Sequence, residues 1–294
     1  MARAERQGLV LKNYAGFYYV EDEEGSVREC VLRGKLRTRV LTGDRVRISL
    51  REANRGVVEE VLPRHSELQR PPVANIDLVL VVFAADRPSP DLVLLDRLLV
   101  LVQHRGLQPV VVLNKCDLQQ SLKAEFVRSY YPTVGYRVVA ASAVRGDGLN
   151  ELAEAVRGRV AVMAGPSGVG KSSLLNAMIP ELRLATGDVS RKLGRGRHTT
   201  RHVELCRVPG GGWIADTPGF SVLDLPPMRP AELAALFPEF EAPAARCRFR
   251  NCLHAREEDC AVKAEVEAGR IAPGRYQHYR AFLAEVIENA RCFR

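Results

Sequence analysis

The chain has 294 residues, more than the roughly 100 to 200 of a usual single domain, so two or three domains are expected. Hydrophobic residues make up 46% and charged residues 27% of it, which excludes wholesale disorder. The longest apolar run, residues 78–85, is far shorter than the ~20 residues that span a bilayer, and the N-terminal residues lack a signal peptide's apolar core. We therefore expect a cytoplasmic protein without a membrane partner.

The formal net charge of +8 permits a nucleic acid partner without requiring one. Residues 28–55 carry nine basic and three acidic side chains, and residues 191–201 carry five basic and none acidic. Each run is either a solvated face or a contact surface for phosphate groups.

Residues 1 to about 65 contain short runs of alternating polar and apolar residues. Glycines at 16, 25, 34, 43 and 56 punctuate these runs. The pattern predicts a small all-β barrel of about five strands, a common platform for oligonucleotides. The alternative is a barrel that only packs on its neighbour.

From about residue 70 to 225, predicted strands alternate with predicted helices, which indicates a parallel sheet in a doubly wound α/β domain. Ligands of such domains bind at the carboxyl ends of the strands. The predicted strands are 76–83, 109–114, 136–142 and 160–165, and the predicted helices are 91–106, 122–131 and 149–158.

Two of these strand ends carry residues suited to reading a guanine base. The Asp117 carboxylate can accept two hydrogen bonds, from guanine N1–H and the 2-amino group, a contact that adenine cannot supply. The predicted base pocket consists of Asn114, Lys115, Cys116 and Asp117 after one strand and Ser142 and Ala143 after the next.

The strand 160–165 leads into a glycine-rich loop of the G-x4-G-K-S type, whose backbone N–H groups close around phosphates. Lys171 is assigned to the β and γ oxygens as a catalytic group, and Ser172 to magnesium. A D-T-P-G motif follows a further strand: Asp216 would hold magnesium through water, and the Gly219 N–H would sense the γ-phosphate. The predicted loop residues are Gly165, Pro166, Ser167, Gly168, Val169, Gly170, Lys171, Ser172 and Ser173.

The order of these motifs is unusual because the base-reading residues precede the phosphate loop. A sheet closes by spatial adjacency of its strands, so a circular permutation of a P-loop domain explains this order. GTP and GDP are the implied ligands.

The segment 194–202 (GRGRHTTRH) is the predicted switch, with Thr200 preferred over Thr199 as a second magnesium ligand. Phe220 follows Gly219 where many GTPases place a water-orienting glutamine. Another group must therefore orient the attacking water, and His198 is the candidate catalytic residue. Alternatively, His198 contacts RNA or solvent.

Three of the seven cysteines cluster with a histidine as Cys247, Cys252, His254 and Cys260. Three thiolates and one imidazole make a complete tetrahedral set for one zinc ion with no open position, which indicates a structural site. Only residues 220–230 separate the D-T-P-G motif from this region, so GTP binding is expected to reorient it against RNA.

The whole chain resembles the ribosome-small-subunit-dependent, circularly permuted GTPases of bacteria. The resemblance rests on NKCD, GPSGVGKSSLLN, GRGRHTTRH, DTPGF and the cysteine-histidine set. It implies an N-terminal OB-fold β-barrel (1–68), a circularly permuted P-loop α/β GTPase domain (69–226) and a C-terminal helical zinc-binding domain (227–294). It also implies slow GTP hydrolysis that the 30S ribosomal subunit stimulates, 16S rRNA contacts and a role in late maturation of that subunit. We expect a monomer.

Two other functions remain open on the residues alone. GPSGVGKSS also resembles the phosphate loop of guanylate kinases, although those enzymes need neither NKCD nor DTPG. The chain could instead be an RNA-binding zinc module whose nucleotide domain is inactive.

Overall fold

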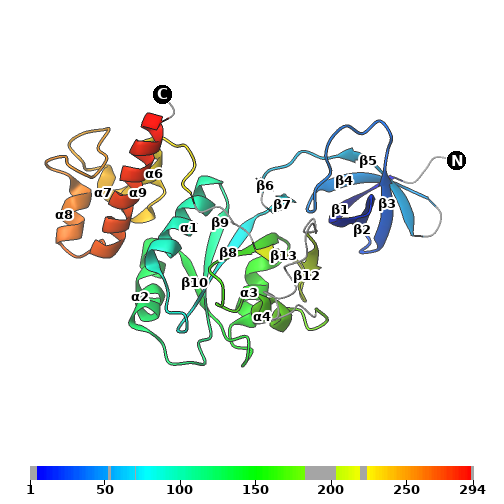
Figure 1. Ribbon diagram of the computed structural model, residues 1–294, viewed down its shortest axis with the longest axis horizontal. Helices are drawn as coiled ribbons and strands as arrows, with labels where there is room; N and C mark the ends of the chain where they lie inside the picture. The colour runs from blue at the N-terminus through cyan, green and yellow to red at the C-terminus, as the bar shows by residue number, and fades with distance from the viewer. Residues whose placement is uncertain (1–4, 52–53, 70, 183–202, 219–223, 293–294) are drawn as a thin grey trace.

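The computed structural model describes residues 5–51, 54–69, 71–182, 203–218 and 224–292. Three parts follow one another along the chain: a barrel, a central α/β domain and a helical region. The barrel and the helical region lie on opposite sides of the α/β domain (Figure 1). Among the described residues, no helix has the length and apolar character needed to cross a membrane.

The barrel closes in the strand order β1-β2-β3-β5-β4, with β3 and β5 parallel and the other pairs antiparallel. This is the five-stranded arrangement of an OB-fold, and it confirms the predicted barrel. Val10, Val20, Ile48 and Val58 fill its core. The strands are β1 (Glu5–Tyr14), β2 (Phe17–Asp22), β3 (Val27–Leu32), β4 (Arg45–Leu50) and β5 (Arg55–Val61).

A short hairpin, β6 (Glu67–Gln69) and β7 (Pro72–Ala74), connects the barrel to the α/β domain. It packs on a barrel loop at Gly43, whose φ is +88° and where a Cβ would lie 2.1 Å from the Ala74 carbonyl oxygen. Only glycine fits there. The connection is therefore held against the barrel.

The α/β domain contains a six-stranded sheet of order β10-β9-β8-β11-β13-β12, in which only β12 is antiparallel to its neighbour. Helices α1 and α2 cover one face, and α3 and α4 cover the other. The strands are β8 (Leu78–Ala84), β9 (Gln108–Asn114), β10 (Arg137–Ala140), β11 (Val160–Ala164), β12 (Leu205–Arg207) and β13 (Trp213–Pro218). The helices are α1 (Leu92–His104), α2 (Leu122–Tyr130), the 3₁₀ turn η1 (Tyr131–Val134), α3 (Leu149–Val156) and α4 (Lys171–Met178).

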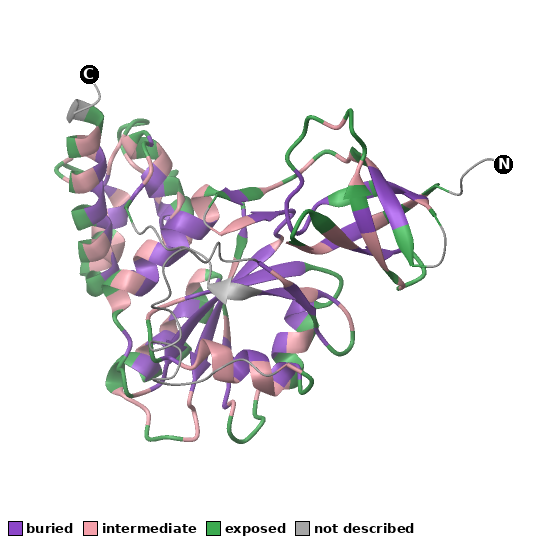
Figure 2. Ribbon diagram, turned by 45° about the vertical axis from the view of Figure 1, so that its right-hand side comes forward, coloured by how far each residue is buried: buried purple, intermediate pink, exposed green. Residues whose placement is uncertain are grey.

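Strand β8 shows why the sheet is doubly wound. Its alternate residues Val79, Val81 and Phe83 join one core, and Leu78 and Leu80 join the other, so both faces of the strand are buried. Figure 2 shows the central strands in the colour of buried residues.

The helical region packs on α1 and shares its core with the α/β domain. Phe237, Phe240, Tyr279 and Phe282 belong to the same apolar cluster as the α1 side of the sheet. The region consists of α6 (Pro230–Ala235), η2 (Pro238–Phe240), α7 (Glu241–Ala244), α8 (Ala261–Glu267) and α9 (Pro273–Cys292).

Candidate functional site

The phosphate loop, residues 165–173, connects β11 to α4. Gly165 has φ of +138°, and a Cβ there would lie 2.0 Å from the Val82 carbonyl oxygen of β8, so the loop needs glycine to leave the sheet. Lys171 Nζ donates to the carbonyl oxygens of Gly165 at 2.9 Å and Pro166 at 2.7 Å. Burial lowers the pKa of Lys171. A partly desolvated ammonium group beside a helix N-terminus is an arrangement that favours phosphate.

Asn114 ties the predicted base-reading residues to the phosphate loop. Its side chain is buried at the end of β9, where Nδ2 donates to the Val169 carbonyl oxygen at 2.8 Å. The Ala143 N–H donates to Asn114 Oδ1 at 3.3 Å. One amide group therefore contacts the loops that follow β10 and β11.

Lys115 makes a second link to the phosphate loop. It has φ of +62°, and its ammonium group donates to the carbonyl oxygens of Gly168 and Arg87, both at 2.7 Å. The aliphatic stem thus crosses between the loops that follow β8 and β11.

The Asp117 carboxylate is oriented by Ser142. Ser142 Oγ donates to Asp117 Oδ1 at 2.6 Å, and this hydrogen bond is the main reason that the pKa of Asp117 is lowered. The Cys116 N–H donates to the Ala141 carbonyl oxygen at 3.0 Å, which holds the two loops together. An ionised, oriented carboxylate can accept the two N–H groups of a guanine edge.

Strand β13 lies beside β11 and brings the backbone of Asp216, Thr217 and Pro218 to the same end of the sheet. Its backbone pairs with β11 from Trp213 to Pro218, with a shift in register between Ala161 and Met163. Such an irregularity is typical near functional sites. The backbone of Asp216 therefore lies at the strand end next to the phosphate loop.

Several predicted residues lie outside the described ranges. They are His198, Thr200 and the rest of the basic run 191–201, together with Gly219 and Phe220.

The predicted metal ligands form one cluster. The ligand atoms of Cys247, Cys252, His254 and Cys260 all lie within 4.8 Å of one another. Cys247 Sγ lies 3.9 Å from Cys260 Sγ, and His254 Nδ1 lies 3.4 Å from Cys260 Sγ and 3.6 Å from Cys247 Sγ. Zn–S bonds of about 2.3 Å give a tetrahedron with edges of about 3.8 Å. These four residues therefore fit a single zinc ion.

Burial makes ionised thiolates in this cluster unfavourable unless a cation is bound nearby. It raises the pKa of Cys252 to about 12 and lowers the pKa of His254. The imidazole is thereby kept in the neutral form that binds metals, whereas the thiol needs a cation nearby to ionise at neutral pH.

Sequence reasoning missed the side chains that position the ligand loop. The Glu257 carboxylate accepts hydrogen bonds from the backbone N–H groups of Leu253 and Ala255, both at 2.8 Å. Tyr276 Oη donates to the His254 carbonyl oxygen at 2.7 Å. Glu257 lies between the predicted ligands His254 and Cys260 in the sequence, and this position could have indicated its role. The sequence around Tyr276 gives no such indication.

The sheet order, the phosphate loop and the base-reading loops together define a circularly permuted P-loop GTPase. Matches to known proteins bear this out. The model of the RsgA GTPase family matches residues 61–226, and that of the RsgA N-terminal domain matches residues 7–58. The chain belongs to the RsgA GTPase family, which confirms the resemblance inferred from its motifs.

Relatives align along nearly the whole chain. A protein of Moorella thermoacetica named small ribosomal subunit biogenesis GTPase RsgA is 52% identical, covering 98% of this chain and 99% of that protein. A protein of the same name from Carboxydothermus hydrogenoformans is 49% identical, covering 97% and 99%. Among solved structures, YjeQ from Thermotoga maritima is 38% identical with a TM-score of 0.83, covering 97% of this chain and 99% of that one. YloQ, described as a circularly permuted GTPase, is 37% identical with a TM-score of 0.82, covering 97% and 96%.

Proposed function

We propose that this protein hydrolyses GTP to GDP and phosphate in late maturation of the small ribosomal subunit, and that the 30S subunit stimulates the reaction. The observation that carries the proposal is the Asp117–Ser142 pair, joined to the phosphate loop through Asn114. This arrangement suits a guanine nucleotide. The relatives' name supplies the ribosomal context.

In this proposal, the phosphate loop and the predicted switch segment 194–202 both supply groups for catalysis. Lys171 stabilises charge on the β and γ oxygens, and Ser172 and Thr200 ligate magnesium. Asp216 holds the same ion through water, and the Gly219 N–H meets the γ-phosphate. His198 orients the attacking water because Phe220 has no polar atom to do so.

The zinc ion has a structural role in this proposal. Three thiolates and one imidazole leave no position for substrate, so the ion would fix the loop between α7 and α8. A rigid loop of this kind can present the helical region to RNA.

The barrel is the proposed contact surface for 16S rRNA. Part of its basic run is paired within the barrel: Arg33 with Glu59, for example, at 2.9 Å. Lys35, Arg37 and Arg39, in contrast, are exposed in the loop between β3 and β4. Exposed cations in a loop of an OB-fold are suited to RNA phosphates. We assign the barrel to residues 1–68, the GTPase domain to 69–226 and the zinc domain to 227–294, in a cytoplasmic monomer.

Turnover assays test this function. GTP hydrolysis is measured with purified 30S, 50S and 70S particles, and a parallel reaction contains GMP. We expect release of free phosphate, accelerated by 30S. Phosphate transfer to GMP would instead identify a guanylate kinase, and no turnover with any particle would favour an inactive nucleotide domain on an RNA-binding module.

A further inference from the structure

The barrel contacts the α/β domain through the hairpin of β12 and β13. Lys12 Nζ of β1 donates to Glu204 at 2.8 Å, just before β12. Thr42 Oγ1, which is buried, donates to the Val203 carbonyl oxygen at 3.0 Å. These contacts fix the chain where it enters β12.

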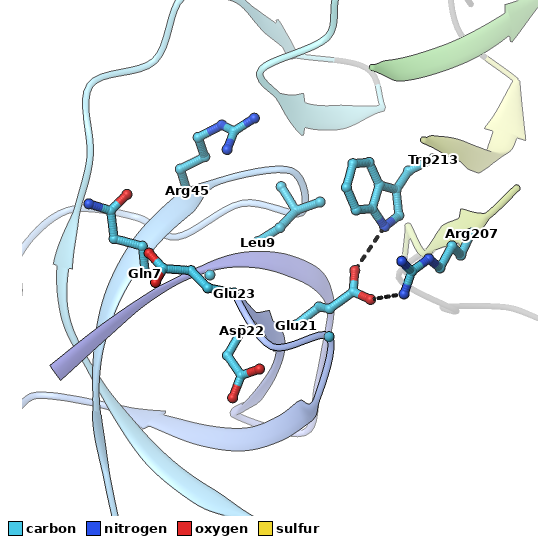
Figure 3. Close-up of a pocket in the computed structure, with 10 residues that line it drawn as sticks. Gln7, Leu9, Glu21, Asp22, Glu23, Arg45, Arg207 and Trp213 are labelled. Carbon is cyan, nitrogen blue, oxygen red and sulfur yellow. Dashed lines mark hydrogen bonds and ion pairs between the residues drawn. The ribbon is translucent and has the colours of Figure 1, made fainter. Parts of the chain in front are cut away.

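Glu21, at the end of β2, holds the other end of the same hairpin. Its carboxylate accepts from Arg207 Nη1 at 2.5 Å and from Trp213 Nε1 at 3.2 Å (Figure 3). Arg207 ends β12 and Trp213 begins β13, so one carboxylate spans both strands. Its side chain is only 9% exposed, although that of Arg207 is 62% exposed. We call the contacts of Glu21 with Arg207 and Trp213 the joint.

The side chains of the joint are not close-packed on every side. A cavity of about 300 Å³ adjoins it, lined by Gln7, Arg45, Arg207 and Trp213, among others. Figure 3 shows the labelled side chains around this space, with the carboxylate of Glu21 turned to the hairpin. The barrel keeps its own core and adds Leu9 to the core of the α/β domain. A polar contact beside a cavity can shift with less loss of packing than a contact within a close-packed core.

The hairpin leads directly to the nucleotide site. Trp213 and Asp216 lie three residues apart in β13, about 10 Å along an extended strand. β13 pairs with β11, the strand that ends in the phosphate loop. A displacement of Trp213 is passed to Asp216 along three residues of backbone, a stretch where the pairing of β13 with β11 is irregular and therefore resists movement less than a regular ladder would.

The helical region contacts the α/β domain at α1, away from the hairpin of β12 and β13. Arg97 of α1 donates to both carboxylate oxygens of Glu285 of α9, at 2.9 and 2.7 Å, and the two parts share one apolar core. The described contacts thus favour movement of the helical region with the α/β domain. Of the two flanking parts, the barrel is the one whose described side chains hold the hairpin of β12 and β13 by hydrogen bonds.

We propose that the joint couples the barrel to the nucleotide site, and that Glu21 is a positioning residue for GTP hydrolysis. A macromolecule that binds the barrel shifts Arg207 and Trp213 through Glu21, and β13 passes the shift to the D-T-P-G segment. By linkage, the nucleotide that occupies the phosphate loop also alters the position of the barrel. The inference rests on the proposed function in taking GTP as the ligand.

Trp213 is the single tryptophan of the chain, so its fluorescence reports on the joint without a label. The emission of the full-length protein is compared with GDP and with a non-hydrolysable GTP analogue bound. We expect the two spectra to differ in the wild type and in Glu59→Ala, and to coincide in Glu21→Ala. Glu59 is the matched control because it accepts hydrogen bonds from Arg33 and Ser49, both within the barrel. Glu21→Gln retains an acceptor for Trp213 and should keep part of the difference.

A kinetic measurement separates positioning from general damage to the fold. With 30S subunits, Glu21→Ala should lower kcat roughly fivefold or more, the lower end of ordinary allosteric coupling, while the KM for GTP stays within about twofold. Nucleotide affinity and circular dichroism verify folding. Coincident wild-type spectra, an unchanged difference in Glu21→Ala, or equal loss in Glu59→Ala would overturn the proposal. If 30S fails to stimulate the wild type, the proposed function fails, and the fluorescence comparison still decides the inference.

Discussion

Arg275 of α9 and Asp96 of α1 form an ion pair inside the core that the helical region shares with the α/β domain. Nη1 and Oδ1 lie 2.5 Å apart, and the two side chains are 2% and 0% exposed. Glu239 also pairs with Arg275, whose guanidinium group lies 4.9 Å from the centre of the Tyr131 ring. Burial alone would lower the pKa of Arg275, but Asp96 and Glu239 outweigh it and raise the pKa.

Removal of this cation should destabilise the protein strongly. Arg275→Ala removes the cation that two buried carboxylates share, which costs about 3 to 5 kcal/mol of the free energy of unfolding. Asp96 keeps its contacts with Tyr131 Oη at 2.8 Å and His278 Nδ1 at 2.6 Å, whereas Glu239 loses its ion pair. Urea denaturation measures the loss. Arg280→Ala, on the exposed side of the same helix, is the control and should change little. Equal midpoints for the two variants would contradict the assigned role of Arg275.

Asp117→Asn should change the base that the protein prefers. The asparagine side chain can donate a hydrogen bond where the carboxylate could only accept, so GTP binding should weaken by about 10²-fold or more. Xanthosine triphosphate, which carries a carbonyl where guanine has its amino group, should bind better to the variant. Titration with both nucleotides measures the switch. Asp86→Asn is a control at the neighbouring strand end, and an Asp117→Asn variant that still prefers GTP would remove Asp117 from the base pocket.

Cys247→Ala should remove the metal. Three ligands remain, so the zinc content should fall from about one ion per chain to nearly none, measured by elemental analysis after gel filtration. The helical region should also loosen, with increased protease cleavage between α7 and α8. Cys30→Ala, a buried cysteine of the barrel core, should retain zinc. Full zinc content in Cys247→Ala would contradict the assignment.

The cations of the β3–β4 loop should govern the salt dependence of ribosome binding. If Lys35 and Arg37 contact phosphates, the double alanine variant should bind 30S more weakly, and the slope of log affinity against log salt should become shallower by about two. Lys123 and Arg128, exposed on α2, provide a matched double variant. Equal slopes for the two double variants would indicate that the basic run of the barrel is a solvated face and not a contact surface for phosphate groups.

Features defined by short spacings along the chain could be predicted from the sequence. The NKCD loop, the phosphate loop and the cysteine-histidine set are each defined by spacings of a few residues, and the structure brings each set together. The alternation of strands and helices likewise predicted the sheet, because burial on both faces leaves a continuous apolar run such as β8.

The contacts between the parts could not be predicted in this way. Glu21 and Trp213 lie 192 residues apart, and Asp96 and Arg275 lie 179 apart. Nothing local distinguishes Glu21 from the neighbouring acids of the same strand end. The partner of Glu21 depends on how the barrel and the α/β domain pack against each other. Hydrophobic periodicity within either unit carries no information about that packing.

His198, the candidate for orienting the attacking water, lies outside the described residues. Phe220 stands where many GTPases have a water-orienting glutamine, and the predicted switch segment 194–202 offers His198. A neutral imidazole can accept a hydrogen bond from the attacking water. If the 30S subunit brings this segment into place, activity should be low in the free protein and high in the complex.

His198→Ala should therefore cost about 10²-fold in 30S-stimulated kcat, the usual contribution of a positioned base, with GTP and 30S affinity little changed. Single-turnover hydrolysis on saturating 30S isolates this step from product release. His202→Ala is the matched control, because it removes the other histidine of the same segment. Turnover of His198→Ala within a few-fold of wild type, together with a large loss in His202→Ala, would move the role to His202. Little loss in both variants would move it to Arg201 or to a group of the ribosome, because neither histidine could then be orienting the water.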